Sequence, residues 1–111
     1  MSVNSYLQPK TFADLCAALR QMGEHSYVVA GGTDFLAQRN GRPWRAEALL
    51  SLSELPELRQ ISPQRELLRI GATATHTAIA EHPLIRERFP ALAKACGNIG
   101  SVAIRNRGTI G

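Results

Sequence analysis

The sequence predicts an α+β or α/β subdomain, in which short strands and short helices share a small core. Three observations favour this class. Apolar residues recur at helical spacing after Thr11, the apolar run of residues 27–30 ends in two glycines, and Leu68, Ile70 and Ala72 alternate as in a strand. The 111 residues, of which 44% are apolar, are enough for the core of at most one ordinary domain.

The first half of the chain is expected to alternate strand and helix. Pro9 disfavours helical backbone at Gln8, so residues 6–10 are expected to be extended. Thr11 is a good N-cap for the amphipathic helix that follows. The expected elements are a helix over residues 12–22 closed by Gly23, a strand over residues 27–30, a helix over residues 33–39, a turn at residues 40–43 and a strand over residues 47–52.

The second half is expected to hold a hairpin followed by short helices. In order, the sequence predicts a helical turn over residues 53–58 begun by Ser53, strands over residues 58–62 and 66–71 joined at residues 62–65, a helix over residues 78–81 capped by Thr75 or Thr77, and Pro83 at an early helical position. A further helix over residues 89–96 should stop at Gly97 and bury a face made of Ala91, Leu92, Ala95 and Cys96. Residues 98–103 are expected to form a loop or an irregular strand.

The composition argues against several classes of protein. No apolar run approaches the roughly 20 residues that a membrane span needs, and residues 1–5 lack the basic and apolar regions of a secretory signal. Cys16 and Cys96 are not at metal-ligand spacing, so we expect two reduced, mostly buried thiols in a cytoplasmic protein. The net charge of +4 comes from scattered arginines, and an aromatic content of 5% does not favour nucleic-acid binding.

The most informative motif is the glycine turn that follows the first apolar run. It consists of Ala30, Gly31, Gly32, Thr33 and Asp34. Glycines let a backbone approach a ligand closely, and the first amides of a helix have no acceptor within the helix, so such a turn can bind a phosphate or diphosphate. The alternative is a plain turn, since two glycines after a strand are common. The motif is neither a Rossmann fingerprint nor a P-loop.

A second glycine motif lies at residues 104–111, where Arg105 and Arg107 flank Asn106. It is expected to be another loop that faces a phosphate or a cofactor. The alternative is that the alternating arginines form a solvated strand face. Two such glycine motifs in one short chain are rarer than either alone.

The two motifs together resemble the flavin-binding subunit of the molybdenum hydroxylases, the family that includes xanthine dehydrogenase and carbon monoxide dehydrogenase. The similar stretches are residues 6–11, 29–36, 68–75 and 104–111, so the resemblance runs along essentially the whole chain in order. It implies the N-terminal subdomain of that family's FAD-binding fold, an α+β arrangement with a small parallel or mixed sheet and flanking helices.

The resemblance also implies a site. In the family the first turn wraps the FAD pyrophosphate and the second loop runs past the flavin. The FAD-binding residues carried over to this sequence are Ala30, Gly31, Gly32, Thr33, Asp34, Ile104, Asn106, Thr109, Ile110 and Gly111. No catalytic residue and no metal ligand is expected on this chain. His76, beside the expected helix start, either neighbours the flavin or stands there only because the flanking threonines cap the helix.

The family further implies partners. A large subunit would hold the molybdenum cofactor, a small subunit would hold two 2Fe–2S clusters, and NAD or another acceptor would take the electrons. Residues 1–111 are expected to be the N-terminal part of an FAD-binding domain that stops within the second motif, and to be weakly stable and inactive alone. The alternative is a truncated, non-catalytic module that docks on partner subunits without binding flavin.

Overall fold

The computed structural model describes residues 2–111. The chain divides into two compact units, Met1–Pro56 and Glu57–Gly111. The first contains a three-stranded sheet and the second a two-stranded sheet. Both units also carry helices, which confirms the expected mixture of short strands and helices.

The first unit is a small parallel sheet with two crossover helices. Its elements are β1 (Ser2–Leu7), α1 (Phe12–Gln21), β2 (Ser26–Val29), α2 (Thr33–Arg39) and β3 (Arg45–Ser51). The strand order is β1-β3-β2 and both pairings are parallel. The three strands end at nearly the same level of the sheet, since Leu50 of β3 pairs with Leu7, the last residue of β1, and Ser51 of β3 pairs with Val29, the last residue of β2.

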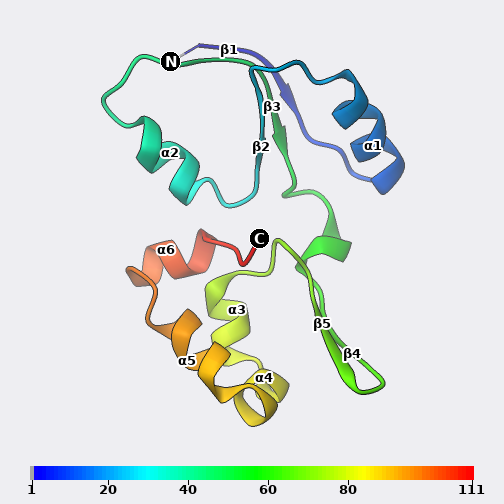
Figure 1. Cartoon of the computed structure of the whole chain (residues 1–111), viewed down its shortest axis with the longest axis vertical. Helices are drawn as coiled ribbons and strands as arrows, with labels where there is room; N and C mark the ends of the chain where they lie inside the picture. Colours follow the sequence, from blue (N-terminus) through cyan, green and yellow to red (C-terminus); the bar gives the residue numbers. More distant parts are fainter. Residues whose placement is uncertain (1) are drawn as a thin grey trace. The chain divides into compact units, whose positions relative to one another are not determined.

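The order of the strands explains where the helices lie. The connection through α1 moves two positions across the sheet and the connection through α2 moves one position back. Because strand–helix–strand crossovers are right-handed, connections in opposite directions place their helices on opposite faces. Figure 1 shows α1 and α2 on opposite sides of the three strands. The carboxyl ends of the parallel strands share one edge, and the glycine turn begins there.

The second unit consists of a hairpin and a group of short helices. Its elements are β4 (Ile61–Gln64), β5 (Leu67–Ile70), α3 (His76–Glu81), α4 (Pro83–Arg88), α5 (Pro90–Gly97) and α6 (Val102–Arg107). A single 3-10 turn, η1 (Pro56–Arg59), leads into it from the first unit. Figure 1 shows the four helices gathered together, and their core is a cluster of buried side chains: Ala74, Ile79, Ile85, Ala93 and Cys96.

Several boundaries differ from the sequence predictions. β1 begins at Ser2, earlier than expected, because strand pairing with β3 and not an apolar run defines it. The 3-10 turn covers the last residues of the helical turn expected over residues 53–58, runs into the strand expected over residues 58–62, and is not begun by Ser53. The expected loop over residues 98–103 ends at Ser101, whose Oγ accepts the amide N–H of Ile104 at 3.3 Å and caps α6.

Two burial predictions were partly wrong. Cys16 is exposed, and no residue of α1, which the structure describes in full, is buried. In α5 the buried positions are Ala93 and Cys96, whereas Ala91 and Ala95 are exposed. The helix therefore turns a neighbouring stripe toward α3 and α4. No helix within residues 2–111 is both long enough and apolar enough to cross a membrane.

Candidate functional site

The first glycine motif lies where β2 leaves the sheet. The carbonyl oxygen of Val29 accepts the amide N–H of Leu52 at 3.0 Å, the last bond before the chain turns. Gly32 has a φ of 79°, in the left-handed region, and precedes the first residue of α2. A Cβ there would meet only Val29 Cγ1, at 3.7 Å, so the backbone conformation and not a lack of space calls for glycine.

The turn carries amides without acceptors. None of the N–H groups from Gly31 to Phe35 has a hydrogen-bond acceptor within the part of the chain that the structure describes. The first bond of α2 runs from the Leu36 amide to the Gly32 carbonyl oxygen at 3.0 Å. Consecutive free amides at the start of a helix carry partial positive charge, so they attract an anion.

The two polar side chains of the motif behave differently. The carboxylate of Asp34 accepts a hydrogen bond from Gln38 Nε2 at 2.6 Å, one turn along α2. It accepts no hydrogen bond from the amides at the helix start. Thr33 is half-buried and lines a pocket on the first unit.

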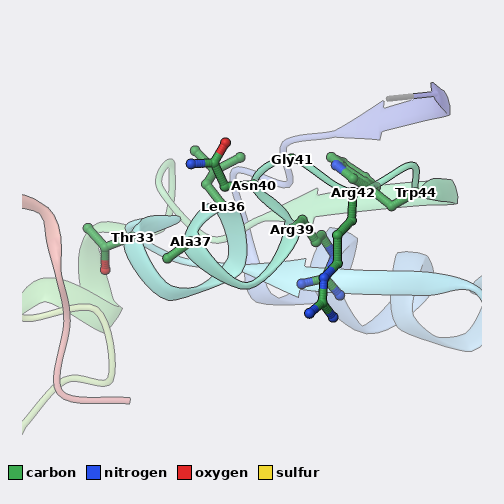
Figure 2. A pocket seen from close by; sticks show the side chains of 8 residues that line it. All are labelled: Thr33, Leu36, Ala37, Arg39, Asn40, Gly41, Arg42 and Trp44. Carbon is green, nitrogen blue, oxygen red and sulfur yellow. The ribbon is translucent and has the colours of Figure 1, made fainter.

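That pocket runs along α2 (Figure 2). It has a volume of about 570 Å³ and combines apolar with basic side chains. Its lining residues are Thr33, Leu36, Ala37, Arg39, Asn40, Gly41, Arg42 and Trp44. Thr33 thus belongs to both the glycine turn and the pocket wall. Sequence reasoning did not identify Arg39 or Trp44 as part of this region, although the spacing of Phe35 and Arg39 by four residues places both on one face of α2.

The second glycine motif differs from the expected loop. Ile104 and Asn106 lie in α6, and only the residues from Gly108 onward are extended. The amides of Ile110 and Gly111 donate to the carbonyl oxygens of Ala74 and Ala72, at 3.1 and 2.9 Å. These two amides are therefore used within the second unit. An isolated antiparallel bridge between Thr75 and Thr109 continues the same pairing.

The α6 residues of the motif are held by α3. The Asn106 Oδ1 accepts a hydrogen bond from Thr77 Oγ1 at 2.6 Å. The buried Gly108 donates its amide to Ile104 O at 2.6 Å, and its carbonyl accepts the amide of His76 at 3.0 Å. Together these contacts fix the backbone of the motif against the start of α3.

Thr75 is the residue that caps α3, since its Oγ1 accepts the amide N–H of Ala78 at 3.1 Å. This resolves the choice between Thr75 and Thr77. The imidazole of His76 packs beside Gly108, and its Nδ1 is buried with no hydrogen-bond partner among residues 2–111.

The predicted site residues thus form two groups. Residues 30–34 lie in the first unit, and the remaining predicted residues lie within residues 104–111 of the second: Ile104, Asn106, Thr109, Ile110 and Gly111. The first group offers free amides, whereas the second offers mainly side chains and carbonyl oxygens. In residues 2–111 no group of three or more histidine, cysteine, aspartate or glutamate side chains could hold a metal ion.

Comparison with known proteins gives consistent matches along the chain. The family model described as the FAD-binding domain in molybdopterin dehydrogenase matches residues 1–111. The nicotinate dehydrogenase FAD-subunit of Eubacterium barkeri is 36% identical, over 96% of this chain and 36% of that protein. The carbon monoxide dehydrogenase medium chain of Hydrogenophaga pseudoflava is 34% identical, over 96% of this chain and 37% of that protein.

Solved structures agree with the sequence matches. The carbon monoxide dehydrogenase of Hydrogenophaga pseudoflava that lacks the Mo-pyranopterin moiety superposes with a TM-score of 0.89 at 34% identity, over 96% of this chain and 37% of that one. The chain therefore spans little more than a third of the length of the relatives that it matches.

Proposed function

The chain belongs to the family of FAD-binding domains of molybdopterin dehydrogenases, and from this premise we propose that it binds the diphosphate of FAD as part of a flavin subunit. The observation that carries the proposal is the glycine turn, where the amides of residues 31–35 have no acceptor in the described chain. A diphosphate would accept these hydrogen bonds, and Gly32 leaves its approach free of a side chain.

The residues present fit this ligand. The donors are backbone groups, so they need no change of protonation, and the Asp34 carboxylate is held along α2 by Gln38. Thr33 can add its hydroxyl at the edge of the turn. We extend the proposal to Ala30 in the same turn. In the second motif we propose as FAD-binding groups the side chains of Ile104, Asn106 and Thr109 and the backbone of Ile110 and Gly111.

The role of this chain is to bind and orient the cofactor. When bound, FAD supplies the redox chemistry, in which electrons arriving from a molybdenum centre through iron–sulfur clusters pass to NAD or another acceptor. The chain's own residues hold the diphosphate by hydrogen bonds from uncharged backbone amides and keep side chains out of its path. We propose a molybdenum-binding large subunit and an iron–sulfur small subunit as partners, because the similar proteins are named as a FAD-subunit and a medium chain. A cytoplasmic location belongs to the same proposal, since both cysteines are free thiols.

The test compares two glycine substitutions in the assembly as cells produce it. Gly32→Ala and Gly41→Ala both place a methyl group at a left-handed position, with φ values of 79° and 72°. Each should cost about 1–2 kcal/mol of folding stability. Only Gly32 lies in the proposed diphosphate turn.

We expect Gly32→Ala to raise the Kd for FAD about tenfold or more, since a hydrogen bond to a charged group is worth about 1.5–3 kcal/mol. Gly41→Ala should leave the Kd unchanged at a similar loss of stability. Equal FAD affinity in the two variants would refute the assignment of the turn. A purified assembly that contains this chain and no flavin would favour the docking module over the FAD-binding role.

A further inference from the structure

The first unit contains an arginine enclosed by aromatic rings. The Cζ atom of Arg39 lies 3.9 Å from the ring centre of Phe35, 4.6 Å from that of Tyr27 and 5.8 Å from that of Trp44. The rings also contact one another. Tyr27 and Phe35 have centroids 5.5 Å apart, and Phe35 and Trp44 meet edge to face at 5.3 Å.

The guanidinium is held on several sides. Arg39 Nη1 donates to the carbonyl oxygen of Phe35 at 3.2 Å, one turn earlier in α2. Its position in the last turn of α2 places a positive charge at the negative end of the helix dipole. The planar guanidinium stacks on rings, which an ammonium group does less well. Arg39 is therefore the central member of a packed cluster and not a freely solvated charge.

The cluster connects the two elements that flank the glycine turn. Tyr27 lies in β2, Phe35 and Arg39 lie in α2, and Trp44 directly precedes β3. Only residues 30–32 separate the end of β2 from the start of α2. Fixing the strand on one side and the helix on the other leaves this short turn little freedom. The directions of its free amides then depend on the contacts of Arg39.

We propose that Arg39 is a positioning residue for the binding of the FAD diphosphate. This inference rests on the proposed function of the glycine turn. Arg39 acts through the cluster with Tyr27, Phe35 and Trp44, which holds β2 and α2 at the separation that aims the amides of residues 31–35 at one anion. A guanidinium suits this task, because it packs between rings and keeps its hydrogen bond to Phe35.

The experiment uses the assembly as cells produce it, with FAD and FMN as the two ligands. Arg39→Met keeps much of the aliphatic stem and removes the guanidinium, while Arg39→Lys keeps a positive charge without the plane. Arg42→Met is the matched control, because Arg42 lines the same pocket (Figure 2) and makes no aromatic stacking contact within the described chain.

We expect Arg39→Met to raise the Kd for FAD about tenfold and to lower the preference for FAD over FMN, since FMN lacks the diphosphate. Arg39→Lys should restore part of that preference, and Arg42→Met should retain all of it. A role in stability alone would lower the binding of both flavins together and leave the preference intact. That result overturns the inference, as does an Arg39→Lys variant, folded by circular dichroism, with an unchanged preference.

Gly32→Ala separates this inference from the function on which it rests. If Gly32→Ala weakens FAD binding and the Arg39 variants do not, the positioning role is wrong and the diphosphate turn stands. If Gly32→Ala leaves FAD binding intact, the turn itself is wrong and the positioning role fails with it. If Arg39→Met does not fold, Arg39→Lys and Trp44→Leu provide the same comparison.

Discussion

Gly108 is a buried glycine whose side-chain position is already filled. Its φ of −63° and ψ of 141° suit any residue, so alanine would meet no backbone strain there. A Cβ would, however, lie 3.0 Å from the carbonyl oxygen of Ile104 and 3.1 Å from Cδ2 of His76. The substitution Gly108→Ala therefore tests packing alone, in the middle of the second glycine motif.

The expected magnitude comes from two opposing effects. Replacing glycine by alanine at a compatible position stabilises a protein by about 0.4–1 kcal/mol, because the unfolded chain loses freedom. Forcing an extra methyl group into a packed interior costs about 1–3 kcal/mol. We expect the packing cost to win, so that Gly108→Ala lowers the free energy of unfolding by about 1 kcal/mol.

The assay is urea unfolding of four proteins: the parent chain, Gly108→Ala, His76→Ala and the double variant. Removing the imidazole relieves the contacts at 3.1 and 3.4 Å and leaves the contact with Ile104 O. The double variant should then be about 1 kcal/mol more stable than the sum of the two single effects predicts, a coupling typical of residues in contact.

Gly97→Ala is the matched control. Gly97 also lies in the second unit, is exposed, and its Cβ would meet only the Cβ of Ala80 at an ordinary 3.8 Å. We expect this substitution to raise the free energy of unfolding by up to about 1 kcal/mol. If Gly108→Ala is stabilised to the same extent as Gly97→Ala, the packing of His76 against the second motif is refuted.

Two further predictions concern the helix caps and the thiols. Thr11→Ala should lower the free energy of unfolding by about 1 kcal/mol in urea denaturation, because the Asp14 amide loses its cap at 3.1 Å; Thr11→Ser should keep most of it, and an unaffected Thr11→Ala would contradict the cap. Cys16 should react at once with an aromatic disulfide reagent, whereas Cys96 should react only after unfolding. Burial raises the pKa of the Cys96 thiol above the ordinary 9.0, because the charged thiolate would lose its hydration in the core. The contribution of this thiol to the free energy of unfolding is therefore complete below about pH 9. It is lost as the pH rises through the raised pKa, because the unfolded chain ionises first. Cys96→Ala should abolish this part of the alkaline dependence.

Local signals in the sequence predicted several elements closely. α2 runs over Thr33–Arg39 as expected, and Thr11 caps α1 as expected. Gly41 adopts the left-handed backbone that its predicted turn favours. Each of these features depends on interactions within about one turn of chain, where capping side chains and glycine conformations act.

Features set by distant residues were missed. β1 was recognised only in part, because its residues carry no apolar run and the strand is defined by pairing with residues of β3 that lie 43 positions later, as in the pair Ser2 and Arg45. The residues of α6 were expected in a loop or an irregular strand, although Ser101, which caps the helix, is a typical N-cap residue. The apolar stripe of α1 predicted the helix, but it did not predict that Cys16 would be exposed.

By itself the sequence determined the mixed α+β class, the family and the positions of the two glycine motifs, since these depend on residue types and their order along the chain. Only the tertiary structure decided which backbone groups each motif offers. The amides of residues 31–35 have no acceptor in the described chain, whereas those of Ile110 and Gly111 pair with a segment about forty residues earlier. Arg39 became the centre of an aromatic cluster for the same reason: Tyr27 of β2, Phe35 of α2 and Trp44, which directly precedes β3, meet only when the first unit folds.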